Sequence, residues 1–289
     1  STRQRGRCWT GHYFFLVGMD LDKFGLCGMM ADIAIYFLLQ IVFTAGIIFL
    51  FGWLIALCNR RFYANFGRFG RAVCYITGFI GTPVHELSHA VFCLIFGHKI
   101  VEIKLFQIND ADGTLGYVNH AYNRKNPFQR IGNFFIGVAP IVVISEILYL
   151  LAGLLLPDFI GEMQNYAESI DVSDFASVLM FVFNVFRCFF GYAGMWQWAV
   201  FIVAGIFLAL HMTLSGADIK NAVGGLLFLL LCILFADIII GFVSMDLLKL
   251  ITKCILGMGG GLLCLLLLAL IMAITALVVS FLFKIIVKR

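Results

Sequence analysis

The stretch Gly81-Thr82-Pro83-Val84-His85-Glu86-Leu87-Ser88-His89-Ala90 places two histidines and a glutamate inside an apolar run that covers residues 72–96. On a helix, His85 and His89 share one face because they are about one turn apart. Ionisable side chains are costly inside an apolar membrane helix, and those that occur there mark functional sites. The run is long enough to cross a bilayer, which takes about 20 residues. The stretch therefore predicts a functional site inside a transmembrane helix.

The pattern His-Glu-x-x-His has the spacing of a zinc site. Two imidazoles four residues apart can both bind one Zn²⁺. Glu86, beside the first ligand, can act as the general base that deprotonates a metal-bound water and can later protonate a leaving amine. The metal lowers the pKa of that water toward about 7 and polarises a scissile carbonyl. We therefore predict one Zn²⁺ per chain, with Glu86 as the catalytic base.

The composition supports a membrane environment. Of the 289 residues, 62% are hydrophobic and 12% are charged, whereas soluble domains are about 45–50% apolar and about 25% charged. Six apolar segments are long enough to span a bilayer; they cover residues 32–58, 72–96, 131–156, 196–217, 223–245 and 254–286. The predicted fold class is an all-α polytopic membrane protein of about six transmembrane helices, with one small β-hairpin after the motif helix.

The hairpin is predicted from the residues that follow the motif. Val101, Ile103 and Leu105 alternate with charged residues, which is the period of a β-strand. Residues 109–113, Asn-Asp-Ala-Asp-Gly, are typical of a turn. Residues 114–118 can then return as a second strand. We predict a hairpin over residues 99–122.

The chain divides into an N-terminal segment and one membrane domain. Residues 1–31 are predicted to be cytoplasmic or interfacial. Residues 32–289 are predicted to form a single integral-membrane domain with an extracytoplasmic loop at 157–195. Most Lys and Arg residues near the span ends lie on the side of the termini, which predicts cytoplasmic termini, and the plasma membrane is the expected location. The net charge of +4 is weak and argues against nucleic-acid binding.

A catalytic zinc needs a third protein ligand, with the fourth position left for water. The carboxylate candidates are Asp218 at the end of the fourth predicted span, Asp237 inside the fifth and Glu146 inside the third. In the predicted orientation Asp218 has a depth comparable to that of His85 and His89. Depth therefore favours Asp218, while Asp237 and Glu146 stay open as alternatives.

These residues resemble the site-2 protease family of intramembrane zinc metalloproteases. Residues 81–90 are similar to that family's HExxH helix, residues 98–122 resemble the hairpin that follows it, and residues 137–140 resemble the opening of the next helix. A later helix of the family supplies an Asp ligand, and its match here is Asp218. The family's Asn-x-x-Pro and Leu-Asp-Gly context is absent, since residues 214–220 read Leu-Ser-Gly-Ala-Asp-Ile-Lys. The resemblance covers residues 72–222.

The resemblance implies a zinc endopeptidase that cleaves membrane-embedded or membrane-associated protein and peptide substrates. In place of the family's Asn, His211 is expected to donate a hydrogen bond near the oxyanion. An edge strand can hold substrate in extended form by strand addition, so Val101, Ile103, Leu105 and Gly113 are predicted substrate contacts. Substrate and membrane lipid are the expected partners.

A different function stays open from the residues alone. Intramembrane His and carboxylate groups also mark ion and proton pathways. A transporter or channel could use a cluster of such groups, namely His85, Glu86, His89, Glu146 and Asp237. The transporter predicts ion flux in liposomes without any proteolysis, and the sequence shows no internal repeats, which argues mildly against it.

Overall fold

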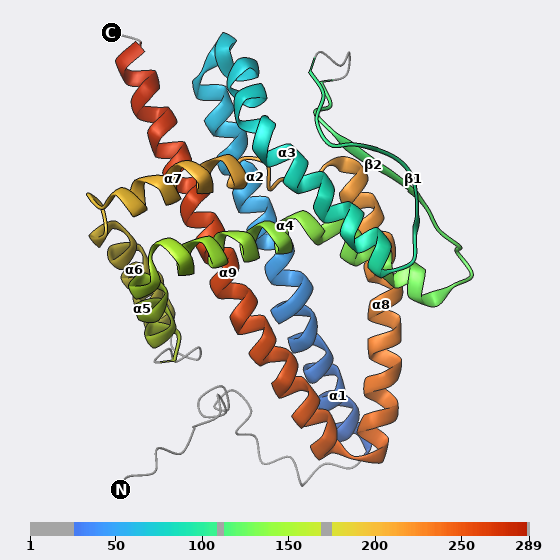
Figure 1. The fold of residues 1–289 in the computed structure, drawn as a ribbon. Helices are drawn as coiled ribbons and strands as arrows, with labels where there is room; N and C mark the ends of the chain where they lie inside the picture. The colour runs from blue at the N-terminus through green and yellow to red at the C-terminus, as the bar shows by residue number, and fades with distance from the viewer. Residues whose placement is uncertain (1–25, 109–112, 169–174, 288–289) are drawn as a thin grey trace, which may run out of the picture.

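In its described residues the chain folds almost entirely into helices, with a two-stranded sheet between α3 and α4 (Figure 1). The computed structural model describes residues 26–108, 113–168 and 175–287. The helices are α1 Leu26–Ile41, α2 Ile47–Asn65, α3 Gly70–Ile95, α4 Pro127–Leu155, α5 Pro157–Glu168, α6 Phe175–Gly191, α7 Trp196–Ala209, α8 Gly216–Val243 and α9 Met245–Val287; the strands are β1 Lys99–Lys104 and β2 Tyr117–Ala121. A π-helical turn, Val42–Gly46, joins α1 to α2, and a 3₁₀ turn, Gly67–Phe69, precedes α3.

Within the described residues, four helical segments are long and apolar enough to cross a membrane: Gly28–Asn65, Pro127–Leu155, Gly216–Val243 and Met245–Val287. A bent pair, Leu179–Gly191 and Trp196–Ala209, adds a fifth candidate if it counts as one broken span, with 120° between its halves. Large apolar side chains stay uncovered along α8, where Leu231 and Phe235 are 65% and 67% exposed. Lipid covers such side chains favourably, so the predicted class of helical polytopic membrane protein is confirmed.

The count of about six spans differs from this finding at two places. The predicted span at 72–96 forms α3, which is long enough but is not among the candidate spans. The hydropathy of this helix is lowered by polar side chains, namely those of Thr82, Glu86, Ser88 and the two motif histidines. The predicted span at 196–217 ends early, because α7 stops at Ala209 after 14 residues. A helix of that length covers about 21 Å, less than the hydrocarbon thickness of about 30 Å.

Helix α4 lies at the centre of the packing and contacts α3, α8 and α9. In Figure 1 it crosses α2 and α9 near the middle of the molecule. Ile141, Ile144 and Leu148 of α4 are completely buried. The crossing with α8 is close because Gly225 of α8 lies directly against the backbone of Phe134. Small residues allow this kind of approach between membrane helices.

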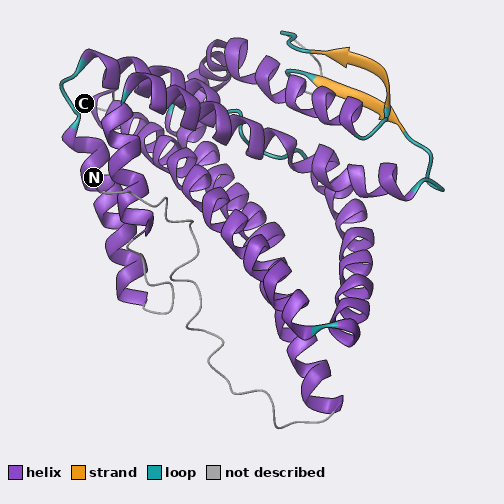
Figure 2. Cartoon of the chain, turned by 60° about the horizontal axis from the view of Figure 1, so that its bottom comes forward, coloured by secondary structure: helices purple, strands orange, loops and turns teal. Residues whose placement is uncertain are grey.

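The predicted hairpin is confirmed. Strands β1 and β2 pair antiparallel, with Lys99 opposite Ala121 and Lys104 opposite Tyr117. A register shift between Ile100 and Glu102 bulges β1 at that point. Figure 2 shows the hairpin lying alongside a helix, and contacts from both strands identify that helix as α3. Of the predicted turn, residues 109–112 lie outside the described part, and Gly113 has a positive φ of 78°.

The region predicted as an extracytoplasmic loop is largely helical. It contains α5 and α6, which pack against each other through Phe159 and Phe189. The ring centroids of these two residues are 5.5 Å apart. Most of the predicted N-terminal segment, residues 1–25, and positions 169–174 of the loop lie outside the described part. The sidedness of the termini and the domain boundaries stay predictions.

Candidate metal centre

His85, His89 and Asp218 come together from α3 and α8. One possible ligand atom from each lies within 4.8 Å of the other two. The two Nε2 atoms are 3.1 Å apart, and the Asp218 carboxylate lies 3.3 Å from Nε2 of His89 and 4.0 Å from Nε2 of His85. The spacing of His85 and His89 follows from the helix, whereas Asp218 is brought in by the tertiary structure.

Both imidazoles are held with Nε2 free for a metal. Nδ1 of His85 donates to the backbone carbonyl of His211 at 2.7 Å. Nδ1 of His89 donates to the backbone carbonyl of Ile136, also at 2.7 Å. A proton on Nδ1 leaves the lone pair of neutral imidazole on Nε2, and hydrogen bonds of this kind fix the tautomer and ring orientation of metal-binding histidines. The histidines are therefore oriented as ligands before any ion binds.

The donor set fits Zn²⁺. In a tetrahedral site with Zn–N bonds of about 2.0–2.1 Å, ligand atoms lie about 3.3 Å apart. Two observed separations agree with that value, 3.1 Å between the two Nε2 atoms and 3.3 Å between Nε2 of His89 and Oδ1 of Asp218. The other carboxylate oxygen, Oδ2, lies 4.0 Å from Nε2 of His85. Two Nε2 lone pairs that face each other at 3.1 Å repel unless a cation or a proton lies between them. Two imidazoles and one carboxylate are also a usual ligand set of catalytic zinc.

Asp218 is positioned by the start of α8 and not by the end of the preceding helix, which corrects the expectation that it ends the fourth span. Ser215 is the N-cap of α8, and its hydroxyl accepts a hydrogen bond from the Asp218 backbone N–H at 3.1 Å. In return the Asp218 carboxylate accepts from the Ser215 N–H at 2.8 Å. This reciprocal capping box orients the carboxylate. The pattern Ser-x-x-Asp before an apolar run was visible in the sequence and predicts a helix start there.

The two alternative ligands lie elsewhere. Asp237 is nineteen residues beyond Asp218 on the same helix, about 28 Å along the axis. Its carboxylate accepts a hydrogen bond from Gln40 at 3.4 Å and is 3% exposed. Glu146 is exposed on α4. The structure therefore does not assemble the cluster that a transport pathway through these groups would need.

Glu86 lines a cleft of about 450 Å³ beside the three candidate ligands. The cleft is lined by His85, Glu86, His89, Thr114, Gly116, Tyr117, Val118, Asn119, His120, Tyr122, Ile136, Gly137, Ser215, Ala217, Asp218 and Asn221. Glu86 is only 6% exposed, although it borders this space. A Cβ added to Gly116 would lie 2.8 Å from Cγ of Glu86, so the returning chain of the hairpin packs directly on this side chain. The hairpin thus forms the wall of the cleft that faces Glu86.

The residues predicted to contact substrate do not line the cleft. Val101, Ile103 and Leu105 belong to β1 and the residue after it, and they are not among the lining residues. Gly113 is not among them either. Strand β2 supplies the lining instead, from Tyr117 to His120. Sequence alternation marked both strands but carried no signal for which one faces the metal centre.

His211 contributes its backbone to the site. Its ring Nε2 lies 3.0 Å from the Thr77 hydroxyl and 3.3 Å from the Tyr63 hydroxyl, and its Nδ1 lies 3.2 Å from the Thr82 hydroxyl. The ring is buried and is not among the cleft residues. A Cβ on Gly81 would lie 2.6 Å from the ring, so α3 can approach His211 only because this residue is glycine. That approach brings the His211 carbonyl to His85.

A second glycine contact holds Asp218 beside the histidines. A Cβ on Gly137 would lie 2.7 Å from the Asp218 carbonyl oxygen and 2.7 Å from Cβ of Ala222. Gly137 directly follows Ile136, whose carbonyl accepts from His89. On α4, the Ile136 carbonyl therefore orients His89 of α3, and the adjacent Gly137 contacts α8. In β2, the pKa of His120 is lowered, mainly by burial and then by the nearby His98 and His89 rings.

A comparison with known families agrees with this geometry. Residues 78–190 match a family model described as "Putative zincin peptidase". The match supports a zinc metallopeptidase family. The matched range includes His85, Glu86 and His89 and ends before Asp218. The choice of Asp218 as a candidate ligand therefore rests on the structure alone. The chain matches none of the curated proteins and none of the solved structures compared with it. Zinc is therefore the expected cofactor, and zinc-dependent peptide hydrolysis is the activity that the family match indicates.

The Ser215 cap gives a prediction for the metal centre. Replacing Ser215 with Ala removes the acceptor of the Asp218 N–H, which lowers the free energy of unfolding by about 1 kcal/mol. Because the carboxylate is then less well oriented, zinc affinity is expected to fall about 10-fold. Thermal unfolding and competition with a chelator in detergent measure the two effects. Ser215→Thr retains the hydroxyl and should retain both values; an Ala variant with unchanged zinc affinity would contradict the orienting role.

Proposed function

We propose that this chain is an intramembrane zinc endopeptidase that hydrolyses peptide bonds of membrane-embedded or membrane-associated polypeptides. The observation that carries the proposal is the convergence of His85, His89 and Asp218, with Nε2 of both histidines free, beside Glu86 in an open cleft. This site belongs to a chain with at least four membrane-capable helical segments in its described part. The transporter alternative lacks such support, because Asp237 and Glu146 do not join the site.

The residues of the site have separate roles. His85, His89 and Asp218 would hold Zn²⁺, which when bound supplies Lewis-acid activation of water and of the scissile carbonyl. Glu86 takes the proton of the attacking water and delivers it to the leaving amine as the C–N bond breaks. The His211 and Ile136 carbonyls keep both imidazoles in the metal-binding tautomer. Packing of Gly116 against Glu86 keeps bulk water from that side of the carboxylate.

Strand β2 is the proposed substrate platform. Its residues Tyr117–His120 line the cleft, so an extended segment added beside β2 would pass the metal centre. A transmembrane helix must unwind before its peptide bonds can be cleaved, because its carbonyls are hydrogen-bonded within the helix. Strand addition replaces those hydrogen bonds with ones to the hairpin. The contacts first predicted on β1 are therefore assigned to β2 in this proposal.

The position of Asp218 supports access of water to the site. Asp218 lies in the first turn of a span of 28 residues. Such a helix is about 42 Å long and exceeds the hydrocarbon thickness of about 30 Å. The metal centre therefore lies near one end of the span, where water is available for hydrolysis.

The proposal is tested with a purified reporter that has one apolar span of about 20 residues, carrying a central Gly-Pro to weaken its helix. In detergent, the wild-type protein is expected to cleave the reporter within or next to the span, with the cut located by mass spectrometry. A zinc chelator should stop the reaction, and added Zn²⁺ should restore it. A matched reporter with Leu-Ala in place of Gly-Pro should be cut several-fold more slowly.

Unfolded casein serves as a soluble comparison substrate. Cleavage of casein but not of the reporter would overturn the intramembrane part of the proposal while leaving a zinc peptidase. Cleavage of neither substrate by zinc-loaded protein, with the reporter incorporated in the same micelles, would overturn the proposed function.

A further inference from the structure

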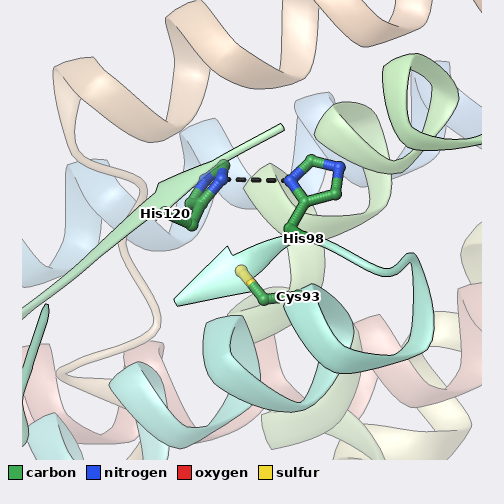
Figure 3. Close-up of side chains that lie close together, drawn as sticks. All are labelled: Cys93, His98 and His120. Carbon is green, nitrogen blue, oxygen red and sulfur yellow. Dashed lines mark hydrogen bonds between the residues drawn. The ribbon is translucent and has the colours of Figure 1, made fainter. Parts of the chain in front are cut away.

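A second cluster of metal-binding side chains lies beyond the motif. Cys93 near the end of α3, His98 just before β1 and His120 in β2 offer ligand atoms that all lie within 4.8 Å of one another. Figure 3 shows the Cys93 thiol and the two imidazoles gathered in one place, with a ring nitrogen of His98 facing one of His120. The cluster shares no residue with the His85–His89–Asp218 centre.

The cluster continues the same face of α3. His85, His89 and Cys93 follow one another at intervals of four residues, so their side chains lie on one stripe of the helix. Cys93 is about 6 Å farther along the axis than His89. Metal ions that share bridging ligands in two-metal sites are about 3.5–4 Å apart. The spacing of the two clusters therefore suits two separate ions.

His98 is oriented in the way of a metal ligand. Its Nε2 donates to the backbone carbonyl of Gln129 at 2.7 Å, so the lone pair of the neutral ring is on Nδ1. The ring stacks on Tyr122 with an interplanar angle of 12°, which fixes its plane. His98 is 4% exposed and Cys93 is completely buried. The polar atoms of these side chains therefore face each other away from solvent.

A hydrogen bond alone accounts for only part of this arrangement. Nδ1 of His120 lies 3.0 Å from Nδ1 of His98, a distance at which the first can donate to the second. Such a bond pairs one nitrogen of each imidazole and does not involve the thiol. A cation at this point uses all three groups, because neutral imidazole and thiolate are both ligands of zinc.

We propose that Cys93, His98 and His120 form a second zinc site, with Sγ of Cys93 and Nδ1 of each histidine as ligands. Binding replaces the thiol proton with the metal and releases that proton to solvent. The remaining coordination position takes a water. The bound ion ties β2 to the end of α3 and to the segment that precedes β1. Since β2 lines the cleft, the bound ion holds the cleft wall against the motif helix.

Cobalt substitution tests this site without any assay of peptide hydrolysis. Co²⁺ bound by a thiolate absorbs in the near ultraviolet through sulfur-to-metal charge transfer, and Co²⁺ bound only by imidazole and carboxylate does not. The wild-type protein, stripped of metal and reloaded with Co²⁺, is expected to show this absorption. Cys93→Ser should lose it, while His89→Ala should keep it, because the first cluster contains no sulfur ligand.

Two further variants make the outcome decisive. Cys232→Ser changes an exposed cysteine of α8 and should keep the charge-transfer absorption. His120→Gln should weaken or shift the absorption while Cys93 is still present, and its zinc content should fall by about one ion per chain relative to wild type. Circular dichroism shows whether each variant is folded.

The proposal is overturned if folded, cobalt-loaded wild-type protein shows no sulfur-to-cobalt absorption, or if that absorption persists unchanged in Cys93→Ser. Failure of the first cluster to bind metal would leave the absorption in place, so the two centres are tested separately. Loss of hydrolysis in His89→Ala with the absorption retained is the result that both proposals predict together.

Discussion

Replacing Glu86 with Gln is expected to lower the rate of peptide hydrolysis by at least about 100-fold, while the protein keeps its zinc. The amide has nearly the same shape as the carboxylate but cannot accept a proton from water. Glu86 lines the cleft beside His85 and makes none of the ligand contacts, so the change leaves the donor set intact. The measurement is the cleavage rate of the Gly-Pro reporter together with zinc content per chain.

The control for this substitution is Glu146→Gln, which changes an exposed glutamate of α4 in the same way. It should leave cleavage and zinc content at the wild-type values. If Glu86→Gln cleaves at the wild-type rate with its zinc bound, Glu86 is not the general base. If Glu86→Gln loses its zinc as well, the residue acts on the metal centre and not on the proton.

Replacing Asp218 with Ala is expected to remove the ion bound by His85 and His89, so zinc content falls by about one ion per chain and cleavage is lost. The carboxylate lies 3.3 Å from Nε2 of His89 and is the only carboxylate in that three-residue cluster. The loss of zinc affinity should exceed the roughly 10–100-fold loss that is typical when a residue that only orients ligands is replaced. Metal analysis after dialysis against a weak chelator measures the effect.

Asp237→Asn is the matched control on the same helix. Asp237 is buried and hydrogen-bonded to Gln40, and the amide can retain that pairing. Its zinc content and cleavage should equal those of the wild type. Zinc lost in Asp237→Asn and kept in Asp218→Ala would reverse the assignment of the third ligand. Both variants are expected to keep the cobalt–sulfur absorption of the second cluster, so any zinc lost from the first cluster can be counted separately.

The pairing of His85 with His89 was predictable because a helix alone brings these two residues to one face. The hairpin was predictable because the strand period and the turn residues are local signals. The start of α8 was also signalled locally, by Ser215 and Asp218, but an apolar run across residues 196–217 concealed it. Hydropathy does not distinguish one long helix from two helices joined by a turn, whereas a capping box does.

Other features of the site could not be predicted from local signals. Gly81 and Gly137 permit backbone approaches that bring the His211 carbonyl to His85 and place Asp218 beside the histidines. The choice of β2 over β1 as the cleft wall depends on which strand packs against Glu86. The grouping of Cys93 with His98 and His120 depends on where the hairpin returns to α3. No periodicity in the sequence carries these long-range contacts.

The amino-acid sequence by itself determined the membrane class of this protein and the zinc-binding face of its motif helix. Both follow from hydropathy and from the 3.6-residue period of a helix, which act over a few turns. Only the tertiary structure decided that Asp218 lies beside His85 and His89, that backbone carbonyls hold both imidazoles with Nε2 free, and that β2 borders the cleft. These features depend on how closely helices pack across distances along the chain that no local pattern spans.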